Sequence, residues 1–92
     1  MIKTIYKYPV TEGKIYLPLN AEILSAKLVR GTICIYALID PTETMKKEHK
    51  VCVFGTGYAI QEDKIENMDF INTIVESNEV FGELVWHVWC EK

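Results

Sequence analysis

EILSAKLVRGTICIYALI, residues 22–39, is the stretch that decides the fold, because it contains two strand-like runs of equal length around one turn. The runs are Glu22–Val29 and Thr32–Ile39, and Arg30-Gly31 lies between them. Glycine adopts a positive φ at little cost, so both a type I′ turn and a type I turn with a glycine bulge are compatible with this pair. The sequence therefore predicts a β-hairpin. Apolar residues that alternate on its two strands are expected to form the centre of the core, namely Leu24, Ala26, Leu28, Ile33, Ile35, Ala37 and Ile39.

Five further segments have the composition or two-residue alternation of strands. They are Lys3–Val10, Lys14–Leu19, His49–Phe54, Phe70–Glu76 and Glu83–Cys90. The turn signal Thr11-Glu12-Gly13 predicts that the first two of these pair as a hairpin, and residues 40–48 are expected to form an exposed loop. The chain is thus predicted to be mainly β, a small antiparallel β-sandwich or partly open barrel of about six to seven strands. At most one short helix is expected, near residues 61–68.

Length and composition limit the classes of protein that fit. The 92 residues are 49% hydrophobic and 25% charged, which predicts one globular domain over residues 1–92. The net charge of −3, with Arg30 as the one arginine, argues against nucleic-acid binding. No apolar run is long enough for a membrane span, and charged residues interrupt the N-terminal segment, so neither a membrane partner nor a signal peptide is expected. Three cysteines within strand patterns predict buried free thiols and a cytoplasmic location.

The last predicted strand, Glu83–Cys90, is apolar on both faces. Trp86 and Trp89 point to opposite sides of a regular strand, so one of them is expected in the core. The other needs cover from a second layer, a partner or a ligand. This second face is where we expect a partner to bind.

No catalytic or metal-binding pattern emerges from the sequence. His49 and Cys52 are three residues apart, as are His87 and Cys90, and residues three apart on a strand point to opposite faces. Neither pair is therefore expected to hold a metal ion. A nucleophile with a histidine and an orienting acid is also not apparent. We predict a protein without enzymatic activity and without a cofactor.

Gly55-Thr56-Gly57-Tyr58 is the local feature with the clearest binding potential. Glycines leave backbone N–H groups open to an anion or to another backbone, and Tyr58 adds a ring and a hydroxyl. A purely structural turn is the alternative. The segment lacks the lysine and the helix of a phosphate-binding loop.

Several short motifs in order along the chain resemble a family of short phage-encoded proteins of uncharacterised function. They are KTIYKYPV at 3–10, LP at 17–18 with AEIL at 21–24, ALIDP at 37–41, VFGTG at 53–57 and LVWHVW at 84–89. The chain differs from the family pattern by Tyr58, where the pattern has a histidine, and by an acidic insert after Ile60. The resemblance implies a phage protein with an accessory role in the cytoplasm of the infected bacterial host.

Small phage β-proteins include anti-defence factors, and some of these are oligomeric sponges for nucleotide signals. The leading hypothesis is accordingly a homo-oligomer that sequesters a nucleotide-derived host immune signal. Lys7 and Lys50 are further candidates to contact phosphate. The expected ligand-binding residues are Gly55, Thr56, Gly57, Tyr58, His87, Trp89 and Arg30. Two alternatives remain open: a protein-binding inhibitor of a host nuclease or defence effector, and a structural or assembly protein of the phage.

Overall fold

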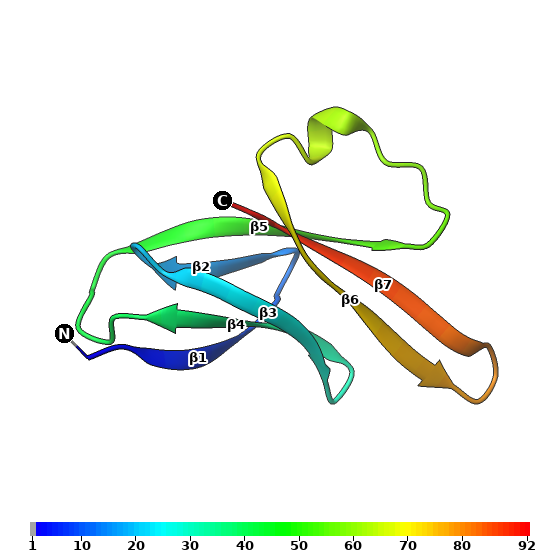
Figure 1. Cartoon of the computed structure of the whole chain (residues 1–92), viewed down its shortest axis with the longest axis horizontal. Helices are drawn as coiled ribbons and strands as arrows, with labels where there is room; N and C mark the ends of the chain where they lie inside the picture. Colours follow the sequence, from blue (N-terminus) through cyan, green and yellow to red (C-terminus); the bar gives the residue numbers. More distant parts are fainter. Residues whose placement is uncertain (1) are drawn as a thin grey trace.

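The computed structural model describes residues 2–92, and its seven strands form two antiparallel sheets that do not close into a barrel (Figure 1). Met1, the first residue of the expected domain, lies outside the described residues. One sheet has the strand order β1-β4-β3 and the other β2-β5-β7-β6. This arrangement confirms the predicted fold class. The strands are β1 (Thr4–Pro9), β2 (Lys14–Pro18), β3 (Glu22–Val29), β4 (Thr32–Ile39), β5 (Lys46–Gly55), β6 (Met68–Asn78) and β7 (Gly82–Glu91).

The β3–β4 hairpin has the predicted bounds. Val29 pairs with Thr32, and the two residues between them have positive φ angles, 50° at Arg30 and 82° at Gly31. Positive φ at both central positions is the geometry of a type I′ turn, which matches the twist of the flanking strands. The alternative with a glycine bulge is therefore not adopted, even though Arg30 lacks the freedom of glycine.

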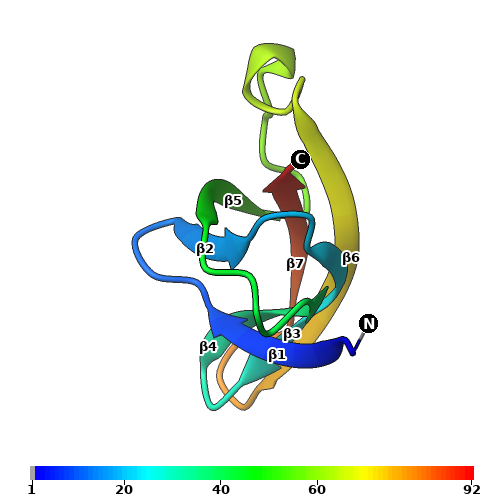
Figure 2. The same cartoon turned by 90° about the vertical axis from the view of Figure 1, so that its left-hand side faces the viewer.

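The predicted hairpin between β1 and β2 is wrong. Glu12 and Gly13 do form a tight turn, with φ angles of 54° and 74°, but β1 pairs with β4 while β2 pairs with β5. The chain thus passes from one sheet to the other at this turn (Figure 2). A turn signal determines where the chain reverses. Which strands then pair depends on how both apolar faces become buried.

Three strands of the second sheet, β5, β6 and β7, are longer than predicted. β5 begins at Lys46, so the loop expected over residues 40–48 ends earlier than we expected. The polar start of β5 pairs with β2, where Pro18 lies opposite Lys46 and Tyr16 opposite Glu48. Because the side chains of Lys46, Lys47 and Glu48 remain exposed, hydropathy alone does not reveal this part of the strand. The predicted short helix is a single 3₁₀ turn, Glu62–Lys64.

The core lies between the two sheets. Ile35 and Ala37 of β4 belong to the same core cluster as Leu17 of β2 and Val88 of β7, and all four are fully buried. Leu24 was expected in this core, but its side chain is 42% exposed. A β-bulge between Ile23 and Ser25 shifts the register of β3, so the alternation predicted for its first half is wrong.

Asn72 joins the two sheets where β3 runs beside β6. Its side-chain amide accepts a hydrogen bond from the Ala26 N–H at 2.7 Å and donates one to the Ala26 carbonyl oxygen at 2.9 Å. Ala26 is fully buried, so its backbone groups have no access to water. Asn72 follows a register shift in β6 that begins at Phe70. The side chain thus occupies the place of a neighbouring strand at the free edge of β3.

The Cys90 thiol is fully buried, and this burial raises its pKa to about 11 from an ordinary value near 9. The unfolded chain loses the thiol proton at a lower pH than the folded chain. The neutral Cys90 thiol therefore contributes fully to the free energy of unfolding below pH 9, and this contribution is lost as the pH rises to about 11. Over that interval the wild type should lose on the order of 1 to 2 kcal/mol more of its unfolding free energy than Cys90→Ala. Urea denaturation at several pH values measures this difference. Parallel curves for the two proteins would contradict the prediction.

Candidate functional site

β6 and β7 extend beyond the rest of the four-stranded sheet as a two-stranded arm, which we define as residues 75–85 (Figure 1). β5 ends at Gly55, which pairs with Trp86, so β7 has no partner on that side from Val85 outward. On its other side, β7 pairs with β6 from Val85 to Gly82. The arm therefore presents strand edges and side chains that the core does not cover.

The tip of the arm has a defined conformation. The Asn78 side-chain oxygen accepts hydrogen bonds from the backbone N–H groups of Val80 and Phe81, at 2.8 and 3.0 Å. Gly82 then takes a φ of 77°, which favours glycine. The turn leaves two apolar side chains largely exposed: Val80 is 81% exposed and Phe81 is 74% exposed. Val75 adds a third apolar side chain on the arm, 57% exposed.

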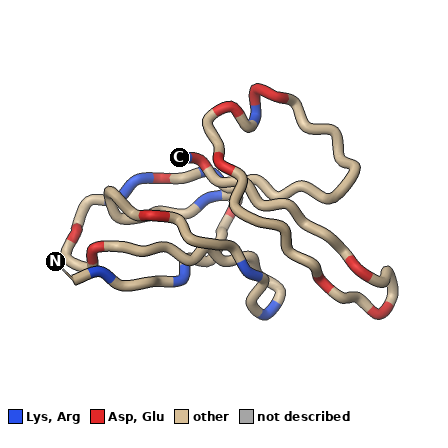
Figure 3. The backbone as a smooth tube through the Cα atoms, in the orientation of Figure 1, with Lys and Arg blue, Asp and Glu red and all other residues tan. Residues whose placement is uncertain are grey.

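The charge of the arm is uniformly negative. Between Ile65 and Glu91 the chain has six of its thirteen acidic residues and none of its ten basic ones. Glu76, Glu79 and Glu83 belong to the arm, whereas the three-stranded sheet includes Lys7, Lys27 and the turn with Arg30 (Figure 3). Our sequence predictions missed this arm, although the absence of cations from residues 65–91 was a signal that could have revealed it.

The glycine loop lies at the base of the arm and contributes to a pocket. Gly57 has a φ of 90°, and the Tyr58 N–H donates a hydrogen bond to the Gly55 carbonyl oxygen at 3.3 Å. The pocket has a volume of about 380 Å³. Its lining consists of Gly55, Thr56, Tyr58, Glu83, Leu84, Val85 and Trp86. Three of the seven expected ligand-binding residues are thus brought together.

His87 fixes the position of this loop. One ring nitrogen lies 2.8 Å from the Thr56 hydroxyl oxygen, and the other lies 3.0 Å from the Thr73 hydroxyl oxygen of β6. Both nitrogens therefore have partners within the protein. The geometry assigns His87 a role in holding the loop against the sheet.

The two tryptophans lie on opposite faces of β7, as predicted. Trp86 packs against the core, lines the pocket and donates its indole N–H to a Glu76 carboxylate oxygen at 3.1 Å. Trp89 lies on the outer face, where its ring contacts Phe70 edge-on with centroids 5.5 Å apart. Phe70 is itself 49% exposed and provides the cover that Trp89 needs. Trp86, and not Trp89, is therefore the tryptophan beside the glycine loop.

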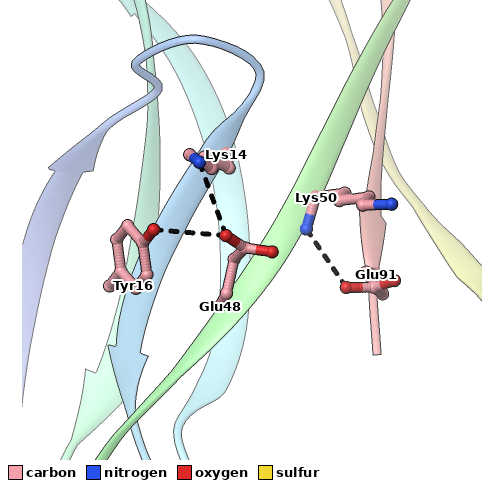
Figure 4. Close-up of polar contacts among 5 residues, drawn as sticks. All are labelled: Lys14, Tyr16, Glu48, Lys50 and Glu91. Carbon is pink, nitrogen blue, oxygen red and sulfur yellow. Dashed lines mark hydrogen bonds and ion pairs between the residues drawn. The ribbon is translucent and has the colours of Figure 1, made fainter.

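The basic residues expected to contact phosphate do not line this pocket. Arg30 lies in the β3–β4 turn and Lys7 on β1, both in the other sheet. Lys50 lies on β5, where its backbone N–H donates to Glu91 at 3.3 Å (Figure 4). Glu83 is the charged residue among those that line the pocket.

The outer face of the four-stranded sheet is polar near β2. Glu48 accepts a hydrogen bond from the Tyr16 hydroxyl at 3.2 Å and lies 3.5 Å from the Lys14 ammonium (Figure 4). Both partners raise the pKa of Lys14, and the effect of Tyr16 is larger than that of Glu48. The three side chains satisfy one another at an exposed site and form a polar, solvated surface.

Within residues 2–92, no set of three metal-ligating side chains gathers at a potential metal site, and no helix has the length and hydropathy for a membrane span. Fold and surface together define a small two-sheet β-protein with a projecting acidic arm. The chain belongs to the family described as a domain of unknown function, DUF7352, whose model matches residues 1–92. No curated protein and no solved structure matches the chain.

Proposed function

We propose that the protein is a non-enzymatic binding protein whose arm docks onto a polypeptide partner. The observation that carries this proposal is the exposure of Val80 and Phe81 on an ordered tip. Exposed apolar side chains in a turn of defined shape are typical of interaction sites, because their burial in a complex is favourable and requires little further ordering. A large apolar side chain at an interface contributes most to the binding energy when it fills a pocket on the partner.

The charge of the arm supports a basic partner. Glu76, Glu79 and Glu83 flank the apolar tip along the chain, and residues 65–91 contain no lysine or arginine. Complementary charge accelerates association and selects among partners, while the apolar contacts slow dissociation. The outer edge of β6 adds unpaired backbone groups, to which a strand of the partner can bind.

The resemblance to phage-encoded proteins suggests which basic partner this is. A host nuclease or defence effector that binds nucleic acid needs a basic surface to do so. An acidic arm with an apolar tip is suited to occlude such a surface. We therefore propose an inhibitor of a host nuclease or defence effector, acting in the cytoplasm of the infected cell.

Affinity capture with the tagged chain from a bacterial host lysate tests this proposal. We expect one polypeptide with a basic surface to be retained at low salt and released at about 0.5 M salt, where charge attraction over more than a few ångströms is screened. The retained protein is then purified and its binding to the chain is measured directly. Retention that does not respond to salt, or a retained protein without a basic surface, would contradict the proposal.

Sequestration of a nucleotide-derived signal remains a second proposal, favoured by the convergence of Gly55, Thr56 and Tyr58 on the 380 Å³ pocket. Trp86 and Tyr58 offer rings for a base to stack on. A phosphate would meet Glu83 there and no cation, which makes this the weaker proposal. Nucleotide extraction from the captured material distinguishes the two, since a sponge retains a small molecule. The same preparation gives the solution mass, which reports whether the expected homo-oligomer forms.

A further inference from the structure

The pocket at the base of the arm has two aromatic residues in its lining, Tyr58 and Trp86. A Cβ atom at Gly55 would lie 3.6 Å from the Trp86 ring and 3.7 Å from the Tyr58 ring, so both rings flank this glycine. Because glycine has no side chain, the space beside both rings is left open at Gly55. Tyr58 is 69% exposed, and the pocket can be reached without unfolding of the core.

The electrostatic character of this pocket favours a cation. Glu83 lines it, and Glu76 accepts the indole N–H of Trp86 at 3.1 Å. A hydrogen bond from the indole to a carboxylate increases the electron density of the ring, and an electron-rich ring attracts a cation over its face. No lysine or arginine lines the pocket to compete for these groups.

We infer that the pocket binds an arginine side chain of the partner. A guanidinium group is flat, stacks on aromatic rings and forms paired hydrogen bonds with a carboxylate, whereas a lysine ammonium matches only the charge. Stacking against Trp86 or Tyr58 uses the flat shape of the guanidinium group, and Glu83, which lines the pocket, supplies the opposite charge. This inference deepens the proposed docking function and rests on it, because the arginine belongs to the partner that the arm engages.

NMR titration of the full chain with N-acetyl-arginine amide tests the inference. We expect saturable shifts of the Trp86 indole N–H and of the Gly55 and Thr56 amides. The affinity for this probe should be about fivefold higher than the affinity for N-acetyl-lysine amide. A guanidinium group can stack on a ring and form paired hydrogen bonds, which an ammonium group cannot, and the gain is moderate because the site is partly exposed. Glu83→Gln and Tyr58→Ala should each weaken arginine binding by a similar factor. Both residues are exposed, so the variants are expected to fold.

Glu79→Gln is the matched control, because Glu79 is on the same arm but does not line this pocket. It should leave arginine binding unchanged. Equal binding of the lysine and arginine probes, or equal loss in Glu79→Gln and Glu83→Gln, would overturn the arginine pocket. Such a result would leave docking of a basic partner intact. Arginine binding at Trp86 without any captured partner would instead support the pocket and contradict the proposed function.

Discussion

Asn72→Ala should lower the free energy of unfolding by about 2 to 3 kcal/mol, the cost of leaving buried backbone groups without partners. The amide of Asn72 satisfies both the N–H and the carbonyl group of Ala26, which is fully buried. Alanine at position 72 removes both hydrogen bonds and leaves no group in their place. Urea denaturation monitored by tryptophan fluorescence measures the loss.

Two variants show whether the hydrogen bonds cause this loss. Asn72→Asp keeps an acceptor for the Ala26 N–H, but the ionised acid has no donor for the Ala26 carbonyl group. Its stability should therefore be well below that of the wild type at neutral pH and should recover in part at low pH, where the protonated acid can donate to that carbonyl group. Asn67→Ala replaces an exposed asparagine for which no side-chain hydrogen bond is present, and its effect should be within about 0.5 kcal/mol. A loss in Asn67→Ala as large as that in Asn72→Ala would contradict the account of the sheet junction.

The double substitution Val80→Ser/Phe81→Ser should weaken partner binding by about 100-fold and leave folding unaffected. Both side chains are mostly exposed in the free protein, so their loss removes little from the core. Burial of two such side chains in an interface contributes roughly 3 kcal/mol, which corresponds to that change in affinity. Isothermal titration calorimetry with the captured partner measures the affinity, and circular dichroism measures folding.

Leu24→Ser/Met45→Ser is the control for this double variant. Leu24 and Met45 are also exposed apolar residues, 42% and 64% exposed, but they lie outside the arm. Their replacement should leave the affinity unchanged. If the control loses as much affinity as the arm variant, general surface hydrophobicity and not the arm carries the binding.

Local signals predicted a large part of the fold. Arg30-Gly31 between two alternating runs was sufficient to place β3 and β4 at their exact bounds. In contrast, the bulge after Ile23 and the pairing of β1 with β4 depend on contacts between distant residues. Thr11-Glu12-Gly13 therefore predicted the turn correctly and the partner strand incorrectly.

The candidate site was only partly predictable. Gly55, Thr56 and Tyr58 do meet in one pocket, because a short glycine-containing turn keeps neighbours in sequence close in space. Arg30 and Trp89 lie elsewhere, since their positions depend on sheet order and on which face of β7 turns inward. The arm depends on the register between β5 and β7, because Gly55, the last residue of β5, pairs with Trp86 and not with Gly82 at the start of β7. The local pattern of neither strand determines this register.

Site-specific photo-crosslinking in host cells tests the central claim, that the arm is the docking surface, most directly. A photoreactive phenylalanine analogue replaces Phe81 in one protein and Met45 in another, both at exposed positions. We predict that the protein with the analogue at position 81 forms one covalent adduct with a basic polypeptide and that the protein with the analogue at position 45 does not. An adduct from position 45 without one from position 81 would contradict the claim.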